Sequence, residues 1–206
     1  MNRSAGLLPS SDKDRILVHS NEEMNHLIDS DELFEYCTLE SFARLYLHKD
    51  GPREDCAILH CVYDMDGSLL DRLEETSGMF DNAEQIICPV WRDCLFGVIC
   101  IVPPSKRVIV LTEPGTPDGY WEDHVLYALR HCFGTKDVAG WDICTKIIPG
   151  NKSGCDCGPL CCLTIRKLLD GSDPYSIIYT EQDTQHCRRD VIQMLQSLYE
   201  HFALPV

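Results

Sequence analysis

No apolar stretch of the 206-residue sequence is long enough to cross a membrane, and its first residues hold no apolar run of the length that a secretory signal peptide needs. Because nothing in the sequence predicts export, we expect reduced thiols and not a framework of disulfide bonds. The two absences together predict a protein of the cytoplasm or the nucleus that does not engage a membrane.

Basic residues are also scarce. Lysine and arginine number 18 against 33 aspartate and glutamate residues, which gives a formal net charge of −15. This balance argues against a nucleic-acid surface and against a patch for anionic lipids, and a solvated acidic face explains it. The sequence also lacks a glycine-rich phosphate loop and internal repeats, and we expect no cofactor.

Cysteine, in contrast, is abundant, with 13 residues. Several cysteines lie inside apolar runs, as Cys100 does, and are typical of core positions. The cluster formed by Cys155, Cys157, Cys161 and Cys162 lacks the two C-x-x-C pairs of a structural zinc site. Two adjacent cysteines on a helix also point about 100° apart. We therefore expect no metal.

The most informative segment is residues 153–158, which read Ser-Gly-Cys-Asp-Cys-Gly and lead into an apolar helix predicted over 159–169. A thiol at a helix N-terminus faces unpaired N–H groups and the positive end of the helix dipole, which favour the nucleophilic thiolate. Cys157 is therefore a candidate nucleophile. The alternative is that Cys157 is a small buried apolar residue, and the motif alone does not decide between them.

Apolar periodicity predicts helices and strands along most of the chain. Residues 1–20 are polar and predict a flexible lead-in, and residues 21–206 predict one domain. Helices, then strands, then helices are typical of an α+β domain. The expected helices cover 31–48, 121–133, 159–169 and a long segment from 180, with a start at Thr180 like a capping box; the expected strands cover 85–90, 95–102, 107–112 and 141–148, while 57–63 fits either structure.

Four segments within residues 31–200 carry a family resemblance. They are the helical region 38–47, the strand region 86–113, the stretch 149–158 that ends in Asp-Cys-Gly, and the region 179–192 with its aromatic residue, polar cap and Gln-Asp pair. In order and spacing they resemble the ubiquitin-like-protein proteases, the cysteine proteases that remove SUMO, and more distantly the adenovirus proteinase. The resemblance implies a papain-like or adenain-like fold, with a mixed β-sheet packed between helices, and a ubiquitin-like modifier or its conjugate as partner.

The resemblance also implies roles for individual residues. Cys157 matches the family nucleophile, and Asn151 lies at or next to the position of the glutamine that donates to the oxyanion. Glu113 ends a predicted strand where the family has the carboxylate that orients the base. Each assignment has an ordinary alternative, because Gly-Asn is common in turns and a carboxylate at a strand end is commonly solvated.

The family base is not matched. Its His-Trp pair corresponds to Asp93-Cys94 in this sequence, so Asp93 occupies the position of the base. With a reference pKa of about 4, an aspartate is a poor acid for a leaving amine near neutral pH. His60, His124 and His131 lie in the predicted folded body, but none of them matches the family position.

Two hypotheses of different class follow. The first is a cysteine-type peptidase or isopeptidase that uses Cys157, catalytically impaired or served by a substitute base. The second is a pseudoprotease that keeps the fold as a protein-binding module. The retained Asp-Cys-Gly favours the first hypothesis, and the missing His-Trp pair favours the second.

Overall fold

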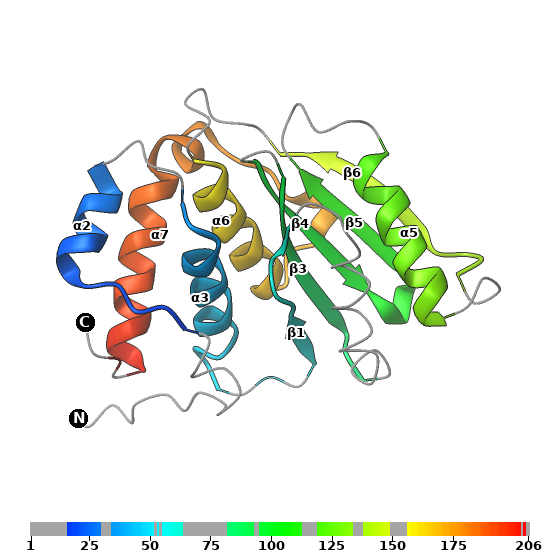
Figure 1. Cartoon of the computed structure of the whole chain (residues 1–206), viewed down its shortest axis with the longest axis horizontal. Coiled ribbons are helices and arrows are strands. Elements are labelled where there is room, and N and C mark those ends of the chain that lie inside the picture. The colour runs from blue at the N-terminus through cyan, green and yellow to red at the C-terminus, as the bar shows by residue number, and fades with distance from the viewer. Residues whose placement is uncertain are drawn as a thin grey trace. The chain divides into compact units, whose positions relative to one another are not determined.

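The computed structural model describes residues 16–29, 34–51, 53, 55–63, 82–92, 95–112, 119–133, 138–148, 156–202 and 204. The chain forms two compact units (Figure 1). The first unit combines residues 1–53, 151–173 and 177–206, and the second combines residues 54–150 and 174–176. The sequence pattern predicted one domain after residue 20.

The second unit is built on a mixed sheet. Within the described residues its order is β1-β3-β4-β5-β6, and β2 also pairs with β3. The pairs β3–β4 and β4–β5 are antiparallel, whereas β1, β2 and β6 run parallel to their partners. The strands are β1 (Cys56–Ile58), β2 (Val62–Tyr63), β3 (Gln85–Arg92), β4 (Leu95–Val102), β5 (Arg107–Thr112) and β6 (Asp142–Ile147). The four predicted strands and the mixed α+β class are thus confirmed.

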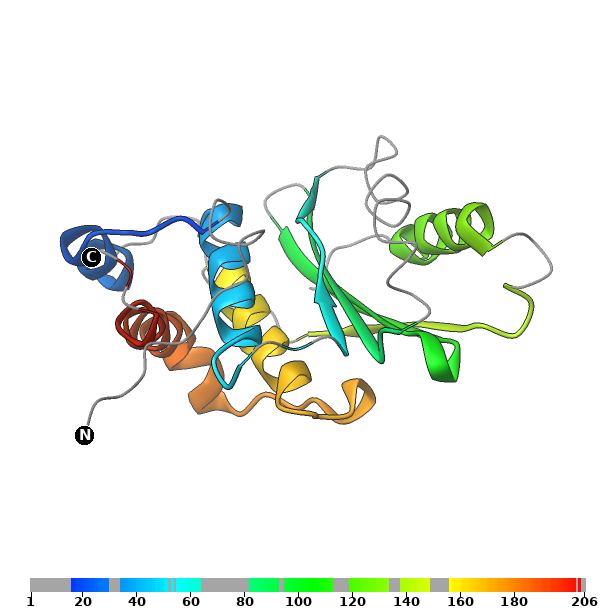
Figure 2. The same ribbon diagram turned by 90° about the horizontal axis from the view of Figure 1, so that it is seen from below.

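Helix α5 (Tyr120–Phe133) lies along one face of this sheet (Figure 2). Its apolar residues Trp121, Val125 and Leu129 join a buried cluster with side chains of β3, β4 and β5. The six central residues of β4 are all buried, which explains why this strand reads as a continuous apolar run and does not alternate.

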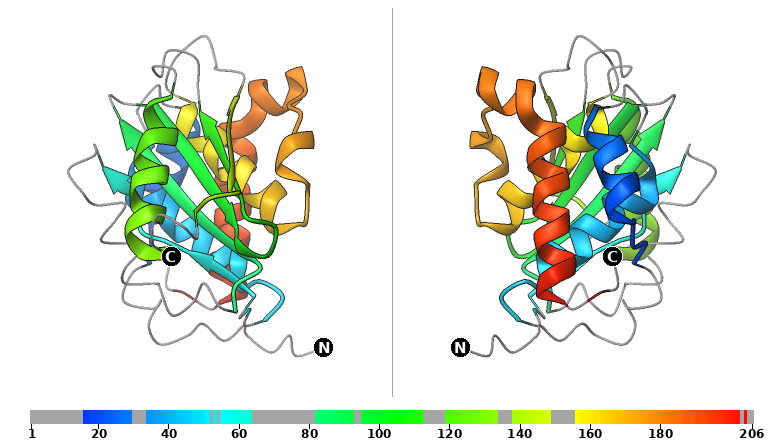
Figure 3. Two further views of the ribbon diagram at one scale, coloured as in Figure 1. Left: turned by 90° about the vertical axis from the view of Figure 1, so that its right-hand side faces the viewer. Right: turned by 90° about the vertical axis from the view of Figure 1, so that its left-hand side faces the viewer.

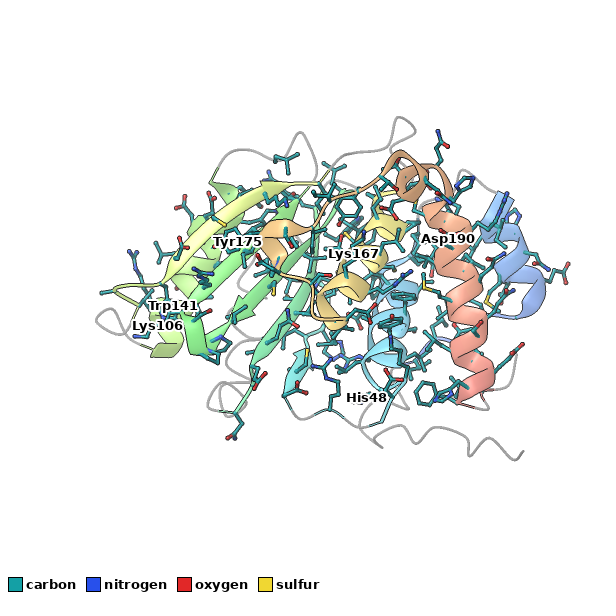
Figure 4. All side chains as sticks on the ribbon, turned by 180° about the vertical axis from the view of Figure 1, so that it is seen from behind. His48, Lys106, Trp141, Lys167, Tyr175 and Asp190 are labelled. Carbon is teal, nitrogen blue, oxygen red and sulfur yellow. The ribbon has the colours of Figure 1, made fainter. Side chains whose placement is uncertain are left out.

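A wide turn connects β4 to β5. Pro103–Ser105 forms a short 3-10 helix, and Lys106 closes it with a left-handed backbone, φ 52°. Beyond the turn, Asp142 donates its main-chain N–H to the Lys106 carbonyl at 2.9 Å. The Tyr175 hydroxyl in turn donates to the Asp142 carboxylate at 3.1 Å, and Figure 4 shows Tyr175 beside β6.

The first unit is helical. Three of its helices were predicted, α3 (Tyr36–Leu47), α6 (Cys157–Leu169) and α7 (Glu181–His201), and α3 packs against both of the others. A further described helix, α2 (Asn21–Asp29), lies beside α7 (Figure 3). It was not predicted: Met24, Leu27 and Ile28 have helical spacing, but the segment has nine residues and is otherwise polar. No described helix is both long and apolar enough to span a membrane.

The last residues of the predicted lead-in are hydrogen-bonded to the helices. Leu17 donates its N–H to the Ser41 hydroxyl at 2.8 Å and accepts from the Tyr199 hydroxyl at 2.7 Å. The His19 ring is 2.7 Å from the Thr38 hydroxyl. Residues 17 and 19 therefore tie α3 to α7 within the first unit.

Helix α7 begins with the predicted capping box. The Asp183 N–H donates to the Thr180 hydroxyl at 3.0 Å, and the Thr180 N–H donates to the Asp183 carboxylate at 2.8 Å. Burial opposes the charged carboxylate, but the Thr180 N–H and the Lys167 ammonium outweigh it and hold the pKa of Asp183 below its ordinary value. The predicted apolar face of α7 is buried and comprises Val191, Ile192, Leu195, Leu198, Tyr199 and Phe202.

Candidate active site

Cys157 is the first residue of α6. The first helical hydrogen bond runs from the Leu160 N–H to the Asp156 carbonyl at 2.9 Å, so the N–H groups of Cys157 and Gly158 lie outside the helical ladder. The Cys157 side chain is 1% exposed. The predicted helix thus extends back to the candidate nucleophile and places its thiol at the positive end of the helix dipole.

Gly158 allows α6 to approach the segment before α3. A Cβ atom built on Gly158 would lie 2.4 Å from the Cβ of Phe34, a distance that no side chain tolerates. Phe34 is itself buried. The glycine of Asp-Cys-Gly is therefore required by close packing behind the thiol.

Asp156 occupies the N-cap position of α6, but its side chain makes no capping hydrogen bond. The carboxylate instead accepts from Nε of Arg188 in α7 at 2.9 Å. The two side chains are 18% and 9% exposed, so the ion pair is largely buried. Sequence analysis missed this partner, because Arg188 was notable only as part of the motif of the closing helix.

The other three predicted site residues, Asp93, Glu113 and Asn151, lie outside the described residues. The flanking strands are described. The Val98–Leu111 pairing places the beginning of β4 and the end of β5 at the same end of the sheet. In sequence, Asp93 precedes β4 and Glu113 follows β5.

The histidines proposed as substitute bases all belong to the second unit. His60 follows β1, whereas His124 and His131 lie on α5. Nδ1 of His124 is 2.7 Å from the Tyr120 carbonyl one turn earlier, and the His131 ring lies 6.2 Å from that of Tyr127. The two histidines of α5 therefore make contacts within their own helix.

No protein-family model matches the sequence, and no curated protein sequence matches it significantly. Solved structures do match. The yeast Ulp1 protease domain, solved in complex with Smt3, has a TM-score of 0.66 at 13% identity, and the match covers 100% of both chains. The Ulp1-like SUMO protease catalytic domain of Chaetomium thermophilum has a TM-score of 0.62 at 17% identity, covering 84% of this chain and 76% of that one. The chain has the Ulp1-like protease fold.

A bacterial structure matches as well. The effector protein ChlaDUB1 of Chlamydia trachomatis has a TM-score of 0.54 at 10% identity, covering 97% of both chains. Together the matches confirm the resemblance at the level of the fold.

Most described cysteines of this Ulp1-like chain are core residues. All ten whose side chains are described are free thiols, and Cys100, Cys161 and Cys162 are completely buried. Burial raises the pKa of Cys100 to about 12 and that of Cys162 well above its ordinary value, so these thiols stay protonated and inert. Among the described residues, no three His, Cys, Asp or Glu side chains are placed to hold a metal ion.

Elemental analysis tests the expectation of a metal-free protein. Purified under reducing conditions, the chain should carry far less than one zinc per molecule, because its cysteine spacing lacks paired ligands. One tightly bound zinc per chain, lost when Cys155 and Cys161 are replaced by serine, would contradict this prediction.

Proposed function

We propose that the chain is a cysteine-type peptidase or isopeptidase of the ubiquitin-like-protein protease class, with Cys157 as nucleophile and slow turnover. The observation that carries the proposal is the placement of Cys157 as the first residue of α6 within a Ulp1-like fold. The position of Cys157 at the helix N-terminus favours its thiolate, and Cys161 and Cys162 further along α6 lack this stabilisation.

The chemistry assigns a step to each residue. The Cys157 thiolate attacks the scissile carbonyl, and a new S–C bond forms as the carbonyl oxygen becomes an oxyanion. Two groups are proposed to donate hydrogen bonds to that oxygen: the main-chain N–H of Cys157 and the side-chain amide of Asn151, which lies six residues earlier in the sequence. Collapse of this intermediate breaks the C–N bond, and the leaving amine must take a proton, which Asp93 supplies poorly near neutral pH. Water then hydrolyses the resulting thioester, which releases the carboxylate product and the Cys157 thiol. Glu113 is the carboxylate that would orient a base.

A ubiquitin-like modifier is the proposed partner. One structural neighbour, the yeast Ulp1 domain, was solved with Smt3, the yeast ortholog of SUMO. That complex supports a modifier or its conjugate as the partner of this chain. The compartment that we propose is the cytoplasm or the nucleus. The excess of acidic residues gives no support to nucleic acid as a partner.

Covalent capture tests the proposal. SUMO or ubiquitin carrying a C-terminal electrophile should form a one-to-one adduct with the folded chain, because capture needs an activated thiol and no leaving amine. Peptide mapping should place the adduct on Cys157. The Cys157→Ala variant should form none, and Cys161→Ala, which alters a buried thiol one turn along α6, should react like the wild type. No adduct, or an adduct on another cysteine, would refute Cys157 as the nucleophile.

The second candidate function is a pseudoprotease that binds a modifier without cleaving it, and the Asp93-Cys94 pair favours it. Calorimetric titration of Cys157→Ala with free modifier separates the two functions. Binding by this variant, together with no capture and no hydrolysis by the wild type, would support the binding module. Capture by the wild type supports the protease.

A further inference from the structure

The guanidinium of Arg188 links three segments of the first unit around the start of α6. Nε donates to the Asp156 carboxylate at 2.9 Å, and a terminal nitrogen donates to the Leu27 carbonyl of α2 at 3.2 Å. Its central carbon lies 5.9 Å from the ring centre of Phe34, within the range of a cation–π contact. One buried side chain from α7 therefore contacts α2, the segment before α3 and the residue before Cys157.

Asp156 is placed for this contact and not for capping. An N-cap aspartate ordinarily accepts from the second or third N–H of its helix, but Asp156 makes no such bond and its backbone is outside the extended region, with φ −99° and ψ 9°. A largely buried carboxylate without a partner would be strongly unfavourable. Arg188, 32 residues later in the chain, supplies a charged partner for Asp156.

Phe34 and Gly158 complete the arrangement. The Phe34 side chain fills the space against Gly158, so α6 cannot move closer to it. The ion pair in turn anchors the residue that precedes the thiol. The position and direction of the first turn of α6 are thus fixed by one steric stop and one charged hydrogen bond.

The pair also sets the local charge. At the Cys187 thiol, which precedes Arg188 in α7, burial, the Asp156 carboxylate and Asp190 raise the pKa, whereas the main chain and guanidinium of Arg188 lower it; the net pKa is about 12. Asp156, Arg188 and Asp190 are thus the charged groups that act on this thiol, while α2 contributes a main-chain carbonyl and Phe34 a ring. Burial also raises the pKa of Cys162, so both neighbouring thiols stay neutral.

We propose that Arg188 is a positioning residue for Cys157, holding Asp156, the end of α2 and the Phe34 ring around the first turn of α6. Arg188 neutralises the carboxylate next to the thiol and fixes the helix terminus that presents it. The inference rests on the proposed function only in taking Cys157 as the nucleophile. It also makes α2, which lies far from Cys157 in sequence, part of the support of the site.

The test measures alkylation of Cys157 by iodoacetamide at pH 7, followed by peptide mass spectrometry on the full chain. Arg188→Gln should slow the reaction about 10-fold, because an unneutralised Asp156 disfavours the thiolate. Arg188→Lys should keep the rate within about threefold of the wild type, since it retains the charge but not the two-nitrogen fork. Arg189→Gln removes the same charge from the exposed neighbouring residue and should change nothing.

Two further variants distinguish the effect of the Arg188 charge on the alkylation rate from the effect of lost packing. Asp156→Asn should react at least as fast as the wild type, and the double variant Asp156→Asn/Arg188→Gln should recover the rate lost in Arg188→Gln. If Asp156→Asn slows alkylation as much as Arg188→Gln does, or if Arg189→Gln has the same effect, the proposal is wrong.

Hydrogen exchange supplies a measurement independent of thiol chemistry. In Arg188→Gln the amides of α2 and of the first turn of α6 should exchange faster, whereas those of α5 should not change. Unchanged exchange at α6 would overturn the positioning role. A thiol that alkylates as predicted but is never captured by a modifier would refute the proposed function and leave this inference standing. A wild-type Cys157 inert to iodoacetamide would refute the nucleophile, and exchange alone would then decide the positioning role.

Discussion

Replacing Asp93 by histidine together with Cys94 by tryptophan should raise hydrolysis of a ubiquitin-like precursor about 10²–10⁴-fold above the wild-type rate. In the proposed site the thiol keeps its activation at the helix N-terminus, but Asp93, which we propose at the base position, is a poor acid for a leaving amine near neutral pH. The expected wild-type behaviour is therefore prompt covalent capture with little turnover. A processing assay on a modifier precursor measures the gain.

Two control variants establish where the gain arises. Adding Cys157→Ala to the Asp93→His/Cys94→Trp pair should abolish hydrolysis, and Glu113→Gln in the same background should reduce it, because Glu113 is proposed to orient the new imidazole. Fast wild-type turnover that is lost in Cys157→Ala but unaffected by Asp93→Ala would show that another base serves the site. His60, His124 and His131 would then be the first residues to replace.

The parts of the fold that sequence predicted are those set by local patterns. Strands β3 to β5 are buried apolar runs, and the register of β4 with β5 follows from the Pro103–Ser105 turn that joins them. Helix α7 carries both its start signal at Thr180 and an apolar stripe. Such signals lie within a few residues of one another, and a single sequence therefore displays them.

The parts that sequence missed depend on distant partners. Helix α2 is held by its contacts with α7, and its own sequence gives a weak apolar pattern. The pairing of Asp156 with Arg188 joins α6 to α7, and no spacing rule predicts it. The Asp-Cys-Gly motif indicated Cys157 as a candidate nucleophile, because a thiol at the start of a helix can be recognised in a sequence. The contacts of its neighbours Asp156 and Gly158 became visible only in the structure of the first unit.

Gly158→Ala, the smallest change next to the nucleophile, should be severe. The added methyl would lie 2.4 Å from the Phe34 Cβ, and a Cβ cannot rotate away as the end of a side chain can. The helix must shift, which should lower the free energy of unfolding by about 2–3 kcal/mol. A displacement of roughly 1 Å at a reacting group can cost about 100-fold in rate, so covalent capture at Cys157 should fall by about that factor. Chemical denaturation and capture kinetics measure the two effects.

Gly171→Ala separates the effect on the thiol from a general loss of stability. Gly171 lies just beyond the other end of α6, where an added Cβ meets nothing within 4 Å but the backbone has φ +85°. That strain should cost roughly 1–2 kcal/mol without moving the first turn, so capture should proceed at the wild-type rate. Phe34→Ala should not rescue Gly158→Ala, because the obstructing Cβ remains, whereas Phe34→Gly removes it and should restore part of the capture rate. Wild-type capture by Gly158→Ala would mean that the approach of α6 to Phe34 does not set the position of the thiol.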